Sequence, residues 1–243
     1  MSNIETNVSR VLAEIQHAAQ AAGRNANAIA LLAVGKGQGA DALAAAYRAG
    51  LRHFGESYLQ EALAKMAALR MPGIEWHFLG PVQANKTRGI AEHFSWLHSL
   101  DRLVIAERLA RQRPAGLPPL QVCLQVNIDR EPTKSGVAPE ALEALALAVA
   151  ELPGLRLRGL MAIPRERHTD AEQRAPFRRL AELLAALRVA APRLAGLDTL
   201  SMGMSADLRA AVAEGATIVR VGQAIFGPRP SKPRQESPCT RAD

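Results

Sequence analysis

The chain has 243 residues, of which 48% are apolar and only 4% aromatic. That length suits one barrel domain, and the composition favours Ala- and Leu-rich helices packed on short aliphatic strands rather than an all-β or disordered chain. The formal net charge is +7, but the arginines are scattered along predicted helices and no basic block is interleaved with aromatic residues, so we predict no nucleic-acid partner.

The cysteines and the chain start set further limits. Cys123 lies in an apolar run and Cys239 in a polar one, so the sequence has neither the spacing of zinc ligands nor that of a disulfide framework. The first residues lack the pattern of a signal peptide, and no apolar run approaches the roughly 20 residues of a membrane span. We therefore expect a cytoplasmic protein without a membrane partner.

The predicted elements begin with an amphipathic helix. Ile4, Val8, Val11 and Ile15 share one helical face, and Gly23 can end the helix in a left-handed cap. The apolar run that follows, residues 28–34, has no helical period. It is typical of a parallel strand that is buried on both faces.

Helical and strand-like segments then alternate. The further predicted strands are residues 52–55, 76–79, 96–99, 121–126, 155–161, 199–201 and 218–221. Together with the first run they make eight, which predicts a single α/β domain, a (β/α)8 TIM-type barrel over residues 1–227 with an extra N-terminal helix. A doubly wound open sheet is the alternative. Residues 228–243 are rich in Pro, Ser and charge, and we predict a disordered tail.

Three details of the helices are also predicted. Asp101 is placed to cap the helix that follows it, and Thr169 with Glu172 forms a capping box. Pro176 lies inside the helix that this box opens, which predicts a kink or a later start.

In such a barrel the functional residues come from the carboxyl ends of the strands. Lys36 leaves the first apolar strand, so much of its stem is desolvated, which favours the unprotonated amine that a Schiff base requires. Ser201 ends the seventh strand, and Gly222 follows the eighth, where backbone N–H groups can bind a phosphate. Each signal also has a simpler interpretation: a solvated lysine at the rim, or an ordinary turn.

Several longer segments carry a family resemblance. They include His53-Phe-Gly-Glu-Ser-Tyr-Leu-Gln-Glu61, Trp76-His-Phe-Leu-Gly80, Arg158-Gly-Leu-Met-Ala-Ile-Pro164, Leu200-Ser-Met-Gly-Met-Ser-Ala-Asp-Leu208 and the run 219–227. In this order, over residues 4–228, they resemble the pyridoxal phosphate homeostasis family, which is similar to the barrel domain of alanine racemase.

The resemblance implies a cofactor and a set of residues that hold it. The cofactor is pyridoxal 5′-phosphate (PLP), bound as a Schiff base to Lys36. Ser201 and the backbone of Gly222 and Gln223 are implied to hold the phosphate. Arg220 is implied to face the pyridine nitrogen, and Met161 to contact the ring. The resemblance implies no catalytic residue and no metal site.

The chain departs from the family pattern at the lysine. Gly37-Gln38-Gly39 replaces a Thr-Lys-Pro-like stretch, and Ser57 stands where the family often has Asn. The glycines predict a looser loop, which leaves the affinity and exchange rate of PLP open.

The implied chemistry favours a carrier over an enzyme. An arginine at the pyridine nitrogen disfavours ring protonation and makes PLP a poorer electron sink. Racemisation also needs a second acid or base, and the tyrosines of this chain are Tyr47 and Tyr58. The resemblance therefore implies a non-catalytic protein of PLP homeostasis that holds PLP and passes it to apo-enzymes. Without the second, dimerising domain of the racemase, we expect a monomer.

Two alternatives remain at this point. The first is a PLP-dependent enzyme such as a weak amino-acid racemase, and the second is a Schiff-base aldolase that needs no cofactor. His53, His77 and Glu56 invite an acid–base interpretation, but packing near the barrel rim is the simpler one.

Overall fold

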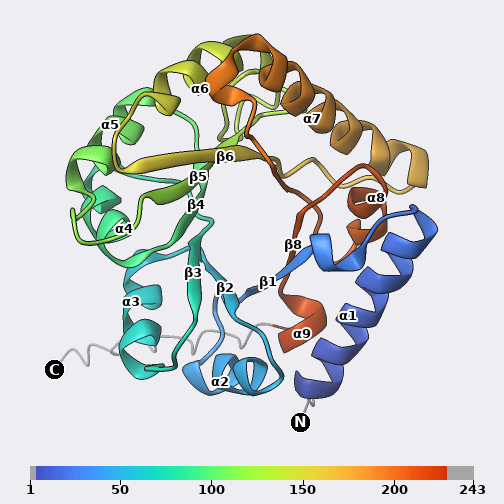
Figure 1. Cartoon of the computed structure of the whole chain (residues 1–243). Coiled ribbons are helices and arrows are strands. Elements are labelled where there is room, and N and C mark those ends of the chain that lie inside the picture. Colours follow the sequence, from blue (N-terminus) through green and yellow to red (C-terminus); the bar gives the residue numbers. More distant parts are fainter. Residues whose placement is uncertain (1–3, 229–243) are drawn as a thin grey trace, which may run out of the picture.

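A closed barrel of parallel strands forms the centre of the molecule (Figure 1). The computed structural model describes residues 4–228. The strands are β1 (Ala30–Val34), β2 (His53–Glu56), β3 (Glu75–Phe78), β4 (Trp96–Leu100), β5 (Leu120–Gln125), β6 (Leu155–Met161), β7 (Thr199–Ser201) and β8 (Ile218–Val221). They pair in chain order, and β8 closes on β1. The predicted (β/α)8 barrel is confirmed, and the open-sheet alternative is wrong.

Helices surround the barrel (Figure 1). They are α1 (Ile4–Ala21), α2 (Ala40–Arg48), α3 (Leu59–Ala68), α4 (Thr87–His93), α5 (Leu103–Gln112), α6 (Leu142–Ala150), α7 (Asp170–Ala190), α8 (Leu208–Ala213) and α9 (Gln223–Phe226). The extra N-terminal helix is α1, which packs against α8 and α9. Gly23 follows it with a φ of 66°, which confirms the left-handed cap.

The helix signals had different outcomes. The capping box of Thr169 and Glu172 is present at the start of α7, and Pro176 lies within this helix, so the helix does not start later. The prediction for Asp101 is wrong. Arg102 is the N-cap of α5, and the Asp101 carboxylate instead accepts a hydrogen bond of 2.9 Å from Arg102 Nε.

Two groups of apolar side chains hold the barrel together. The larger lies between the strands and the helices, where buried Leu, Ile, Val, Ala and Phe side chains pack. A smaller, separate cluster consists of Leu32, Trp96, Cys123, Met161 and Ile218. Successive side chains of a strand point to opposite faces, so each strand contributes to both sides of the barrel wall.

The described part of the chain ends at residue 228, so the predicted tail, residues 228–243, lies almost wholly outside the described residues. None of the described helices is both long enough and apolar enough to cross a membrane.

Candidate functional site

A cavity of about 480 Å³ opens at the carboxyl ends of the strands. Ligand pockets are typically about 300–1,000 Å³. Its lining consists of Val34, Lys36, Gln38, Ser57, Leu79, Ile163, Met204, Ser205, Ala206, Arg220, Gly222, Gln223 and Gly227. Four of the predicted site residues, Lys36, Arg220, Gly222 and Gln223, are thus brought together.

Lys36 reaches this cavity from the loop directly after β1. Its side chain is half-buried, and Nζ lies 4.7 Å from the centroid of the Tyr58 ring. An aromatic ring at this distance attracts a cation and gives the amine a preferred direction. The amine is therefore accessible to a ligand in the cavity and lies beside the Tyr58 ring.

A second lysine, Lys65, holds the Lys36 loop in place through hydrogen bonds. Lys65 of α3 is 5% exposed, and its Nζ donates to the Gly35 carbonyl (2.7 Å), to Glu56 Oε1 (2.7 Å) and to Glu61 Oε1 (2.6 Å). Glu61 Oε1 also accepts a bond of 2.6 Å from the Gly37 N–H. The residues on both sides of Lys36 are hydrogen-bonded to this cluster, although the glycine-rich sequence alone suggests a loose loop.

Glu56 is the most deeply placed acid of this region. It ends β2 with no exposed surface, and among the described residues its Oε2 has no hydrogen-bond partner. Burial raises the pKa of this carboxyl to about 7, against the opposing effect of Lys65. A carboxyl group with such a pKa changes its charge near neutral pH.

Arg220 of β8 lies at the bottom of the cavity. It is 5% exposed; Nη1 donates to Ser201 Oγ (2.8 Å), and Nη2 to the Ala162 carbonyl (2.9 Å). Burial lowers the pKa of Arg220 to about 10, so the guanidinium is still charged at neutral pH. Two hydrogen bonds fix its plane and direction.

Ser201 and Met161 are not among the cavity-lining residues. The Ser201 hydroxyl is fully buried and bonded to Arg220 and to His98, and Met161 is buried in the small apolar cluster. Ser205, in the loop after β7, lines the cavity instead. The sequence motif contains both serines, and only the loop geometry tells which one reaches the cavity.

The turn between the two serines depends on glycine. Gly203 has a φ of 91°, and a Cβ placed there would lie 2.5 Å from Ala211 Cβ. Its carbonyl accepts a bond of 3.0 Å from the Arg220 N–H, which ties the loop to β8. This close turn delivers Ser205 to the cavity.

Comparison with known proteins bears on the ligand. The model of the alanine racemase N-terminal domain matches residues 7–230. The pyridoxal phosphate homeostasis protein of Pseudomonas aeruginosa is 60% identical over 229 residues, which are 94% of this chain and 97% of that one. The corresponding protein of Escherichia coli is 50% identical over 232 residues, 94% and 98% of the two chains. The chain belongs to the family of pyridoxal phosphate homeostasis proteins.

Solved structures agree with this membership. PipY of Synechococcus elongatus, solved with PLP bound, has a TM-score of 0.78 and 42% identity, covering 89% of this chain and 100% of PipY. Alanine racemase of Corynebacterium glutamicum has a TM-score of 0.67 at 20% identity, over 95% of this chain and 62% of that one. That second likeness shows the barrel fold alone.

This family member also carries a chain of histidines beneath Arg220. His98 Nδ1 lies 2.7 Å from Ser201 Oγ, and His98 Nε2 lies 2.8 Å from His77 Nδ1. His77 Nε2 in turn lies 3.2 Å from His53 Nδ1, at the opposite end of the barrel. Polar contacts thus run through the barrel from the cavity to its amino-terminal end.

His98 and His77, the two fully buried histidines of this row, are neutral at neutral pH. Burial, followed by the charge of Arg220, lowers the pKa of His98 to about 3. Burial, His98 and His53 hold the pKa of His77 well below its ordinary value. The expectation that His77 packs near the rim is wrong, because it is 1% exposed in the middle of β3. The sequence reasoning missed both His98 and Lys65.

Proposed function

We propose that this protein binds PLP in the cavity between Lys36 and Arg220 and serves PLP homeostasis by holding and releasing it. The observation that carries the proposal is that the amine of Lys36 and the guanidinium of Arg220 line one cavity of about 480 Å³. Bound PLP would supply an aldehyde that condenses reversibly with a primary amine.

The residues present fit the three parts of that cofactor. Lys36 offers the amine, with Tyr58 holding it in place. Arg220 offers a fixed cationic donor for the pyridine nitrogen, since Ser201 and Ala162 hold its guanidinium. His98, which contacts Ser201, is neutral and therefore adds no second positive charge beside Arg220.

The phosphate would lie against the turn after β8. Gly222 and Gln223 line it at the start of α9, where the first N–H groups of a helix have no acceptor within the helix. We assign the hydroxyl contact to Ser205, because Ser205 lines the cavity and Ser201 does not. An anion is favoured there by both the free donors and the nearby Arg220.

A carrier role is favoured over catalysis by the make-up of the cavity. Among the described lining residues, Lys36 and Arg220 are the ionisable ones. Proton transfer at a substrate carbon on two faces needs a second acid or base. We therefore propose transfer of PLP to apo-enzymes, from a monomer, as the main role.

One observation supports a second candidate, a weak amino-acid racemase. The Tyr58 ring is 4.7 Å from Lys36 Nζ, close enough for its hydroxyl to serve as an acid or base after a small movement. Tyr47 offers no such role, because its hydroxyl donates to the Pro72 carbonyl at 3.0 Å. A racemisation assay of wild type and Tyr58→Phe decides between the candidates.

The binding proposal is tested by visible spectra of wild type and Lys36→Ala after incubation with PLP, followed by borohydride trapping and peptide mapping. We expect a Schiff-base band in wild type that is trapped on Lys36 and is lost in the variant. Lys86→Ala is the matched control and should keep the band. Equal labelling of several lysines in wild type would overturn the assignment.

The carrier proposal needs a separate measurement. Loaded protein is mixed with an apo-enzyme that depends on PLP, with free PLP at the same total concentration as the reference. We expect the apo-enzyme to regain activity in the mixture while wild type shows no racemase turnover. Racemisation at ordinary enzymatic rates that Tyr58→Phe abolishes would replace the carrier role by catalysis.

A further inference from the structure

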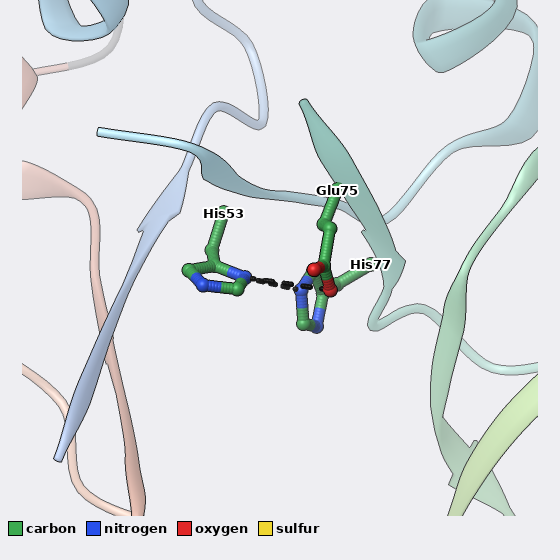
Figure 2. A group of neighbouring side chains, drawn as sticks. All are labelled: His53, Glu75 and His77. Carbon is green, nitrogen blue, oxygen red and sulfur yellow. Dashed lines mark hydrogen bonds and ion pairs between the residues drawn. The ribbon is translucent and has the colours of Figure 1, made fainter. Parts of the chain in front are cut away.

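Three potential metal ligands meet at the amino-terminal end of the barrel, away from the cavity (Figure 2). His53 and Glu75 are the first residues of β2 and β3 and lie opposite each other in the strand register. His77 follows Glu75 by two residues, so strand alternation places both side chains on the same face. None of the three lines the cavity assigned to PLP.

The spacing of their ligand atoms suits a small cation. His53 Nδ1 lies 3.2 Å from His77 Nε2 and 3.7 Å from Glu75 Oε2, and all three atoms lie within 4.8 Å of one another. An ion with tetrahedral bonds of about 2.1 Å holds its ligand atoms about 3.4 Å apart. An ion equidistant from the three atoms therefore requires only small side-chain movements.

Surrounding residues already orient two of the ligands. Trp96 Nε1 donates to Glu75 Oε2 at 3.1 Å, and the Trp96 ring stacks on His77 with centroids 5.4 Å apart and planes 8° from parallel. On its far side, His77 Nδ1 lies 2.8 Å from His98 Nε2. Metal-binding histidines characteristically donate their second N–H to such a partner, which leaves the other nitrogen free to bind the ion.

The access and the ligand types also suit a metal. The side chains of His53 and Glu75 are 36% and 46% exposed, so an ion can enter from solvent. Two imidazoles and one carboxylate favour zinc and its neighbours over Mg²⁺ or Ca²⁺.

We infer that His53, Glu75 and His77 form a binding site for a divalent transition-metal ion such as Zn²⁺, with a fourth position left for water. The ion replaces the hydrogen bond between the two imidazoles. It also fixes the proton of His77 on Nδ1, so that His77 donates to His98. His98 then donates to Ser201 Oγ, which accepts from Arg220 as well. The metal site shares no residue with the cavity proposed for PLP, and binding of the ion does not require PLP.

The test is titration calorimetry of the full chain, free of any tag, with zinc chloride. Every protein carries Cys239→Ser, so that this thiol does not compete for the ion. We expect one ion per chain, with affinity at least tenfold lower in His53→Ala and in Glu75→Gln. His17→Ala, at an exposed position on α1, is the matched control and should bind like the parent.

Cobalt gives a second readout that depends on geometry. Co²⁺ bound by these three residues and water should give the visible bands of a tetrahedral complex, and His53→Ala should lack them while its circular dichroism matches the parent. Equal zinc affinity in all four proteins, or no measurable binding in the parent, would overturn the inference.

Discussion

The two ends of the barrel carry polar groups of opposite character. At the carboxyl end, Lys36 and Arg220 provide cations to the lining of the cavity, and Lys65 beneath it is paired with Glu56 and Glu61. At the amino-terminal end, His53 and His77 meet the half-exposed Glu75. The two cations of the cavity lie where a phosphorylated ligand would bind, and two imidazoles and one carboxylate lie at the opposite end.

The barrel interior between the two ends carries polar groups without carrying unpaired charges. An uncompensated buried charge is expensive, so the groups that cross the interior must be neutral or paired. His98 and His77 satisfy this condition because burial removes their protons, whereas Arg220 retains its charge beside the cavity. The variants below disturb one end at a time, or the link between the ends.

The largest effect is expected at the carboxyl end, from Lys65→Met. This change removes the partner of Glu56, which has no exposed surface, and frees the Lys36 loop. Removing one partner of a buried ion pair costs about 3–5 kcal/mol. We expect the free energy of unfolding in urea at pH 8 to fall by that amount, and the affinity for PLP to fall with it.

The double variant Lys65→Met/Glu56→Gln serves as the control, because it removes the stranded charge together with its partner. It should recover part of the lost stability. A loss below about 1 kcal/mol in Lys65→Met, the size expected for a surface pair, would contradict the role of Lys65 as the support of this loop.

Glu56 should also give a pH dependence opposite in sign to that of the buried histidines, whose lowered pKa values make stability rise with pH. Its pKa in the folded chain is about 7, above its ordinary value of 4.5. Between these values the folded chain holds more protons than the unfolded chain, so stability contributed by this group falls as pH rises. We expect wild type to lose about 3 kcal/mol relative to Glu56→Gln between pH 4.5 and pH 7.

The measurement is urea unfolding of both proteins over this pH range. Carboxylates elsewhere with lowered pKa values, such as Asp129 and Asp198, affect wild type and variant alike and cancel in the difference. A constant difference across the range would show that the Glu56 carboxylate is stabilised as well as in water.

The link between the ends is broken by His98→Leu. The change keeps a similar volume but removes the hydrogen-bond partner of His77 Nδ1 and one partner of Ser201 Oγ. A buried polar group left without its partner costs about 1–3 kcal/mol. Thermal or urea unfolding should show a loss of about 2 kcal/mol, whereas His17→Leu, at an exposed position, should change stability by less than about 0.5 kcal/mol.

How far the sequence predicts these regions depends on the strand ends. A residue one or two positions after a strand, such as Lys36 or Gly222, must lie at the carboxyl rim of a parallel barrel, and both line the cavity. The order and type of the strands follow in the same way from their apolar runs. Family resemblance then supplied the ligand, which strand patterns alone leave open.

The interior was harder to predict for a physical reason. A parallel strand buried on both faces shows no apolar–polar alternation, so the sequence does not reveal which residues point into the barrel. The sequence therefore suggests a rim position for His77 and no role for His98, although both are buried and their ring nitrogens lie 2.8 Å apart. Glu61 and Lys65, four residues apart, are typical of an exposed helical pair, and only the packing of α3 shows that Lys65 is buried.

The smallest predicted effect tests whether the glycines after Lys36 loosen the carboxyl end or hold it in shape. Gly37 has a φ of 75° and donates its N–H to Glu61, whereas Gly39 has a φ of −74° and precedes α2 as its N-cap. A left-handed conformation costs a residue with a side chain about 1–2 kcal/mol. We therefore expect Gly37→Ser to lower stability by about 1 kcal/mol and to weaken PLP binding.

Gly39→Ser is the matched control for that change. No atom lies within 4 Å of a Cβ at this position, and serine is a favoured N-cap, so stability should stay the same or rise by a few tenths of a kcal/mol. Urea unfolding and PLP titration of the two variants give the answer. Opposite signs show that the loop is fixed by its conformation at Gly37, and equal behaviour shows that the loop tolerates either residue and is loose.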